Sequence, residues 1–245
     1  MSVSINNSLP TNAYLIAQIY WLNKIRKNTK EPEITTGINL SITILLCTYI
    51  ESVLNELINS ILVNRLKSTK DESCKRILID FQNKLKKASW NQYIEICKVL
   101  LPKPLNNYTN NEIWKGVKTL FLLRNSIVHG KRIESELHFN DDFKEIEYKG
   151  VYEKILDYFI EQNVVKPNQL KTSTHKILSN QTTIHFIKIT EKFINEIFPK
   201  ICDNQNLDIW GTFNAYKYNT IYSFGIEDSE IEKNTNKIDK GDLPF

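Results

Sequence analysis

Three side chains that could act together on a ligand lie within residues 112–130, in the order Arg124, Asn125 and His129. A guanidinium cannot lose its proton, so at an apolar position it needs a carboxylate partner or an incoming anion such as a phosphate. An imidazole exchanges protons near neutral pH and often acts as a general acid or base. These residue types indicate a site that holds a phosphate and moves a proton.

Helical periodicity predicts that residues 112–129 form one helix, with Asn110 as its N-cap and Gly130 as its stop. Arg124 falls at the centre of the apolar face of this helix. His129 lies in the last turn, where the negative end of the helix dipole favours imidazolium, and Asn125 is placed on the same side to hydrogen-bond it. The apolar face comprises Ile113, Val117, Leu120, Phe121, Ile127 and Val128.

A carboxylate that could pair with Arg124 is Glu51, which lies in a long apolar helix predicted over residues 37–66. Its helical neighbours Ile44, Cys47 and Ile58 are apolar. One interpretation is a structural ion pair that fixes how two buried helices align. The other is that both residues belong to a ligand site, and His129 favours this one, although a histidine that merely caps the helix is the alternative for that residue.

The spacing between Arg124 and His129 restricts how they can cooperate. Five residues correspond to about 140° around a regular helix, so the two side chains do not share a face. Both can serve one site only if the helix end unwinds or if a second copy of the chain supplies part of the site.

Residues 124–130, Arg-Asn-Ser-Ile-Val-His-Gly, resemble the Arg-x4–6-His signature of HEPN domains in the form Arg-Asn-x-x-x-His. The surroundings are also similar: an apolar helix with an embedded Glu (Tyr49-Ile50-Glu51), a helical pair, and then the signature helix. The resemblance covers residues 12–200. It implies an all-α, HEPN-like helical bundle that dimerises with the signature at its interface. It also implies a metal-independent endoribonuclease of toxin–antitoxin or antiphage defence systems.

The resemblance assigns His129 as the general base or acid, Arg124 as the residue that holds the scissile phosphate, and Asn125 as the residue that orients His129. Glu51 would support them. RNA carries its own nucleophile, the 2′-hydroxyl, so no metal or other cofactor is expected. Lys131 and Arg132 follow the signature and either bind flanking phosphates or form a solvated basic turn.

One position departs from a branch of this family. In toxins paired with nucleotidyltransferase antitoxins, a Tyr stands two residues after the His, and this chain has Lys131 there. Regulation by modification of that Tyr is therefore not expected. The expected partners are an RNA substrate, a second copy of the chain, and an antitoxin or phage trigger.

Two other functions remain open at this point. The first is a non-catalytic sensor or adaptor dimer whose Arg124 and His129 bind RNA or a nucleotide without cutting it. The second is a purely structural dimer in which Glu51 and Arg124 form a buried pair.

Composition also favours a helical protein, because 7 Gly and 7 Pro in 245 residues provide few turns. Further helices are predicted over residues 12–28, 73–87, 90–101, 151–164 and 182–200. Residues 136–139 and 145–149 flank Asn-Asp-Asp and predict a short β-hairpin.

The remaining features bear on location and class. A net charge of +4 is too small to imply nucleic acid by itself. The four cysteines lie far apart without a C-x-x-C motif, so we expect no zinc site and a reduced, cytoplasmic protein. The first nine residues lack the apolar core of a signal peptide. The apolar run at residues 38–50 is interrupted and too short to span a bilayer, so no membrane association is expected.

The chain divides by composition into a helical domain over residues 1–202, an aromatic-rich extension over 203–226 and a polar tail over 227–245 that is expected to be disordered. The last residues are Asp242, Leu243, Pro244 and Phe245. They resemble the acidic, Pro-Phe-terminated tip of bacterial single-stranded-DNA-binding proteins. This resemblance implies contact with replication proteins; the alternative is a disordered tail without a partner.

Overall fold

A computed structural model describes residues 11–129, 136–139, 145–165 and 177–207. It is all-α, as predicted, apart from one short hairpin. Each predicted helix is present, with ends shifted by up to five residues. The elements are α1 (Thr11–Asn28), α2 (Pro32–Ser68), α3 (Glu72–Leu85), α4 (Trp90–Leu100), the 3-10 turn η1 (Leu105–Tyr108), α5 (Asn111–Val128), β1 (Glu136–Phe139), β2 (Glu145–Lys149), α6 (Val151–Glu161) and α7 (Asn180–Gln205).

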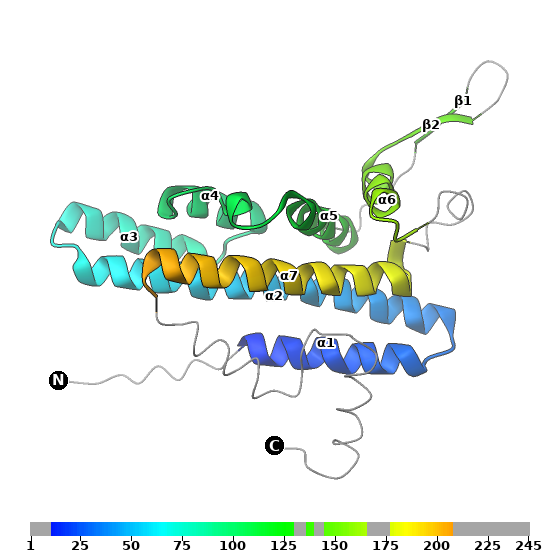
Figure 1. The fold of residues 1–245 in the computed structure, drawn as a ribbon, viewed down its shortest axis with the longest axis horizontal. Coiled ribbons are helices and arrows are strands. Elements are labelled where there is room, and N and C mark those ends of the chain that lie inside the picture. The colour runs from blue at the N-terminus through cyan, green and yellow to red at the C-terminus, as the bar shows by residue number, and fades with distance from the viewer. Residues whose placement is uncertain (1–10, 130–135, 140–144, 166–176, 208–245) are drawn as a thin grey trace, which may run out of the picture.

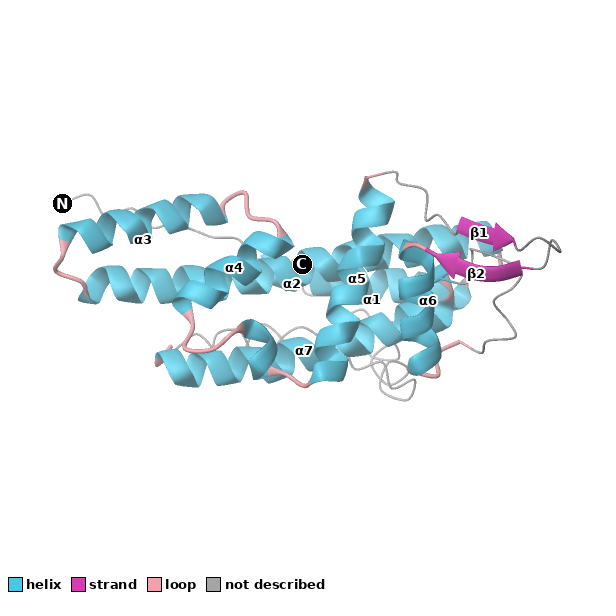
Figure 2. Cartoon of the chain, turned by 90° about the horizontal axis from the view of Figure 1, so that it is seen from above, coloured by secondary structure: helices cyan, strands magenta, loops and turns pink. Residues whose placement is uncertain are grey.

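The long helices α2 and α7 run side by side through the middle of the molecule (Figure 1). Helix α1 packs along one side of α2. Helices α3, α4, α5 and α6 lie on the other side, where α5 crosses both long helices steeply (Figures 1 and 2). Helix α5 therefore has contacts with α2, α6 and α7. This central position fixes the side chains of the signature helix against the core.

Helix α2 is the central helix because its apolar residues point in nearly every direction. Pro32 starts it, at a position where the missing backbone N–H costs nothing. The helix has 37 residues and is long and apolar enough to cross a membrane by length and composition. The expectation drawn from the apolar run at residues 38–50 therefore considered too short a stretch of this helix. However, 56% of the apolar window is buried inside the protein, which is typical of a bundle's core helix.

Helix α5 begins as predicted, because the Asn110 side chain accepts a hydrogen bond from the backbone N–H of Ile113 at 2.9 Å. Its apolar face is rotated slightly from the predicted one. Val128 is 53% exposed and Ile127 is only partly buried, whereas Thr119 and Ser126 are buried. The prediction was wrong for Val128 because the end of α5 extends beyond the helices that it crosses (Figure 2).

The predicted hairpin is present: β1 and β2 pair antiparallel, with Glu136 opposite Lys149. Helix α7 ends at Gln205, so the helical body continues past the predicted domain boundary at residue 202. The rest of the aromatic-rich extension and the whole tail lie outside the described residues.

Candidate functional site

The structure brings together the two charged residues singled out on α2 and α5. An Nη2 atom of Arg124 lies 2.5 Å from Oε1 of Glu51, although 73 residues separate them in the sequence. The Arg124 and Glu51 side chains are 20% and 22% exposed, respectively. The pair is therefore mostly buried but still reachable from solvent, so the guanidinium is not sealed within the core.

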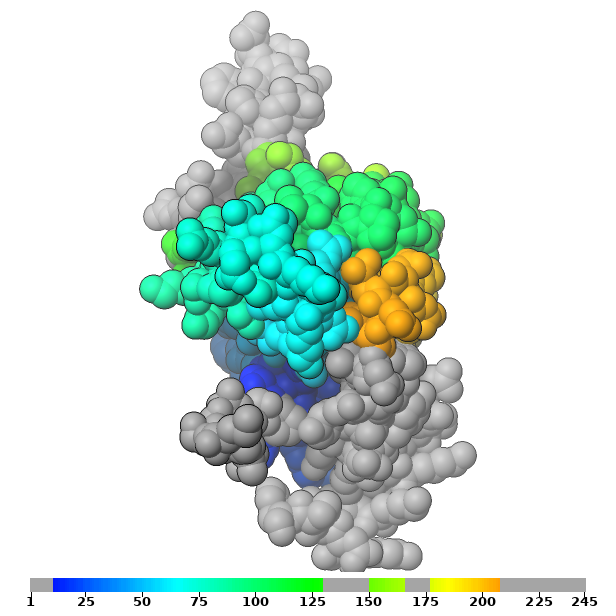
Figure 3. Space-filling view, turned by 90° about the vertical axis from the view of Figure 1, so that its left-hand side faces the viewer, coloured from blue at the N-terminus to red at the C-terminus, as the bar shows by residue number. Residues whose placement is uncertain are grey.

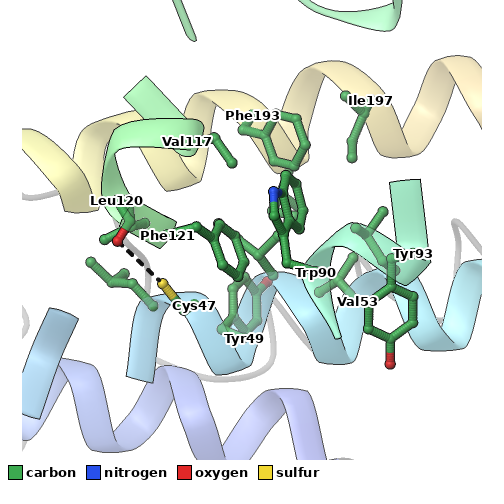
Figure 4. Close-up of a cluster of buried hydrophobic side chains, with 14 of the residues drawn as sticks. Cys47, Tyr49, Val53, Trp90, Tyr93, Val117, Leu120, Phe121, Phe193 and Ile197 are labelled. Carbon is green, nitrogen blue, oxygen red and sulfur yellow. Dashed lines mark hydrogen bonds between the residues drawn. The ribbon is translucent and has the colours of Figure 1, made fainter. Parts of the chain in front are cut away.

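Aromatic packing holds the guanidinium in place. Its Cζ atom lies 5.2 Å from the centre of the Phe121 ring, one turn earlier on α5. Phe121 also stacks on Trp90, with ring centres 4.1 Å apart, and Trp90 meets Phe193 of α7 edge-on (Figure 4). Helices α4, α5 and α7 therefore meet in one cluster beside the ion pair, which restricts how far Arg124 can move.

Burial raises the pKa of Glu51, while the charge of Arg124, its hydrogen bond and the backbone N–H of Trp90 act in the opposite direction. Burial also raises the pKa of the Cys47 thiol and keeps that group neutral. The charge of Arg124 acts to lower this pKa, and the charge of Glu51 acts to raise it. The Cys47 Sγ lies 3.8 Å from the carbonyl oxygen of Leu120 (Figure 4). Tyr93 has a raised pKa because of burial and the nearby charge of Glu51. The pair thus has neutral neighbours and no second carboxylate among the groups that influence its pKa.

His129 and Asn125 lie at the end of α5, and both are exposed. His129 is the C-cap residue, and its backbone N–H donates to the carbonyl oxygen of Asn125 at 3.2 Å. Between the side chains of these two residues there is no hydrogen bond, so within one copy Asn125 does not orient the imidazole as the resemblance implied. Its exposure leaves the amide available to a second copy or to a ligand.

The five-residue spacing between Arg124 and His129 places their side chains on different faces of α5, as expected. Arg124 faces Glu51 in the interior, while Asn125, Val128 and His129 are exposed. His129 lies about 7.5 Å farther along the helix axis than Arg124. Within one copy, the structure therefore brings Glu51 and Arg124 together and leaves His129 apart from them.

Other predicted residues lie beyond the part of the chain that is described. These are Lys131, Arg132 and the terminal residues Asp242, Leu243, Pro244 and Phe245. Among the described residues, no group of three or more His, Cys, Asp or Glu side chains is arranged to hold a metal ion.

Two polar pairs escaped the sequence analysis. Glu56 of α2, five residues after Glu51, accepts a hydrogen bond from the Asn12 side chain of α1 at 2.6 Å. The Tyr158 hydroxyl of α6 lies 2.6 Å from the Nε2 atom of His185 on α7. Glu56 was visible as a second carboxylate in an apolar helix, whereas no sequence signal links Tyr158 to His185.

Comparisons with known proteins add no relative. No protein-family model, no curated protein and no solved structure matches this chain. The site must therefore be interpreted from its own geometry.

Proposed function

We propose that this chain is a metal-independent endoribonuclease that works as a symmetric dimer. The observation that carries this proposal is the position of Arg124: its guanidinium is held in an apolar wall, one-fifth exposed, a little more than one helical turn from an exposed imidazole. The HEPN-like signature supports the same function. The assignment to toxin–antitoxin or antiphage defence rests on that resemblance alone.

Glu51 leaves Arg124 able to bind a phosphate. A guanidinium has five N–H donors in a fixed plane, and the hydrogen bond to Glu51 is donated by one nitrogen, Nη2. The carboxylate fixes the direction of the remaining donors and restricts the motion of the side chain. Glu51 is therefore a positioning residue, and Arg124 is the group that meets the phosphate.

A symmetric dimer accounts for how Arg124 and His129, which lie on different faces of α5, can serve one site. The end of α5 carries the exposed Val128 between Asn125 and His129, and the proposed dimer places this helix end at the interface. In a symmetric arrangement the same patch faces itself, so the imidazole of each copy lies beside the other copy's α5, and the one-fifth of each guanidinium that is exposed completes the cleft. The spacing that separates Arg124 from His129 within one copy then becomes compatible with a shared site.

The reaction requires only the RNA and these side chains. The imidazole of His129 takes the proton of the 2′-hydroxyl, and the 2′-oxygen attacks the adjacent phosphorus while the bond to the 5′-oxygen breaks. The leaving 5′-oxygen takes a proton from water or from the second imidazole of the dimer, so the products are a 2′,3′-cyclic phosphate and a 5′-hydroxyl. A positioned base contributes about 10²–10⁴-fold, and a fixed cation at the developing charge adds a comparable factor.

The test is RNA cleavage in the presence of EDTA by the wild type, His129→Ala and Arg124→Ala, with product ends identified by mass spectrometry. Lys118→Ala is the matched control, because it removes an exposed cation from the same helix. We expect cyclic-phosphate products from the wild type and the control, and a loss of at least about 100-fold in either site variant.

Other outcomes would contradict the proposal. Folded wild-type protein that binds RNA but never cuts it indicates the non-catalytic binding module. The third function, a structural pair, has direct support from the short contact between Glu51 and Arg124. It is indicated if Arg124→Ala unfolds the protein while His129→Ala leaves both folding and RNA cleavage unchanged.

A further inference from the structure

The net positive charge of the chain is concentrated in one segment. Residues 65–103 contain ten Lys or Arg and four Asp or Glu, a net charge of +6. The whole chain carries only +4, so the rest of it is slightly acidic. Such an asymmetry indicates an anionic partner for the basic part.

The segment forms one end of the molecule. It comprises the last residues of α2, all of α3 and α4, and their connections, which lie together in the end-on view of Figure 3. Helix α3 packs mainly on α2, and Leu85 is its only fully buried residue. Arg76, Lys84, Lys86 and Lys87 are exposed on α3 and in the turn after it.

Internal ion pairs neutralise some of these cations but not those of the turn. Lys84 lies 2.7 Å from Asp80, and both side chains are more than half exposed. Lys86 contacts only an amide oxygen, that of Asn83 at 3.3 Å. Neither Lys86 nor Lys87 has a carboxylate partner within the described ranges. The turn therefore keeps two uncompensated charges.

This turn leads directly to the candidate site. Lys86 and Lys87 come four and three residues before Trp90, whose backbone N–H acts to lower the pKa of the Glu51 carboxyl. Four residues of chain span at most about 14 Å, a distance that a few nucleotides can cover. In Figure 2 the connection from α3 to α4 and the C-terminal end of α5 lie on the same side of α2.

We propose that the basic turn, residues 86–87, together with the start of α4, binds RNA phosphates next to the one held by Arg124. This inference rests on the proposed function and adds a path for the strand. Continuity with Arg124 favours a single strand of RNA over an anionic membrane. Carboxylates at positions 72, 80 and 95 pair with lysines of α3 and α4, so these helices offer a flat anionic surface less uncompensated charge than the turn offers a narrow strand.

The test is binding of a short fluorescein-labelled single-stranded RNA by the full chain, measured by anisotropy at several salt concentrations. A His129→Ala background keeps the RNA intact. Lys86→Gln/Lys87→Gln removes the two charges of the turn. The matched control, Lys30→Gln/Lys154→Gln, removes two exposed lysines from elsewhere. Circular dichroism and urea unfolding check that all variants fold alike.

Each phosphate contact to single-stranded nucleic acid contributes about 0.7 to the slope of log affinity against log salt. We expect the turn variant to lose about 1.4 from this slope and to bind about 25-fold more weakly at 0.1 M salt, with the control nearly unchanged. Equal losses in both variants, no loss in the turn variant, or no RNA binding by the parent protein would overturn the inference. Binding to anionic lipid vesicles without binding to RNA would also overturn it.

Cleavage measurements separate this inference from the proposed function. If the parent protein binds RNA through the turn but the wild type never cuts it, cleavage is rejected and the binding surface stands. If the wild type cuts RNA and the turn variant has an unchanged kcat/KM and affinity, the surface is rejected and the proposed function stands.

Discussion

Replacing both Glu51 and Arg124 by Met separates the structural role of the ion pair from its chemical role. Each side chain is about one-fifth exposed, so the pair lies between a surface pair and a fully buried one. Surface pairs contribute up to about 1 kcal/mol, whereas removing one partner of a buried pair costs about 3–5 kcal/mol. We therefore expect Glu51→Met alone to destabilise the fold by about 2–3 kcal/mol, because it leaves an unpaired guanidinium in the apolar wall.

Arg124→Met alone should destabilise the fold less than Glu51→Met alone. In Arg124→Met the carboxyl of Glu51 remains, and burial already raises the pKa of that group, so it can take up a proton and become neutral. A guanidinium has no such escape. The double variant replaces both charges with apolar side chains of similar size, and we expect its free energy of unfolding to lie within about 1 kcal/mol of the wild type.

Urea unfolding of the four proteins forms a double-mutant cycle and measures the coupling energy, which we expect to be about 2 kcal/mol. RNA cleavage with EDTA is measured on the same preparations. The double variant should be folded and inactive. A folded double variant that still cuts RNA would show that Arg124 is not needed for the reaction, and a double variant as unstable as the sum of both single variants would refute the coupling.

Three further predictions concern the core around the site. Gly116→Ala should destabilise the fold by about 1–2 kcal/mol, because the new Cβ would lie 2.5 Å from the Tyr158 hydroxyl and 2.9 Å from Ile189. This overpacking exceeds the gain of about 1 kcal/mol in helix propensity. An unchanged midpoint of urea unfolding would contradict the prediction. Burial raises the pKa of Glu56, so the stability that this group contributes is present at acidic pH and is lost as the pH rises through the folded-state pKa. The variant Glu56→Gln should therefore be more stable than the wild type at pH 7 but not at pH 4. Equal stabilities of the two proteins at pH 7 would count against this prediction. Burial lowers the pKa of His185 to about 4, so the free energy of unfolding of the wild type should fall by up to about 3 kcal/mol as the pH falls from 6.5 to 4. A His185→Gln variant whose stability has the same pH dependence would disprove the assignment.

The sequence by itself determined the helices and the existence of a charged pair. Apolar residues recurring at helical spacing predicted each α-helix that the structure describes, because that spacing reports which face of a helix must avoid water. The Asn110 cap was predicted for the same local reason. Glu51 and Arg124 could be matched across 73 residues because each is a charge in an apolar stretch and must find a partner.

Only the tertiary structure decided what surrounds that pair and how far the core extends. The Trp90 ring stacks on Phe121, and its backbone N–H influences the pKa of Glu51, only because α4 packs on α2 beside α5. Val128 is exposed because α5 runs past the helices beneath it, which its own periodicity does not reveal. The pairing of Tyr158 with His185 likewise depends on how α6 and α7 approach each other. Spacing along a chain specifies the faces of each helix, whereas the packing of side chains between helices sets which of those faces meet.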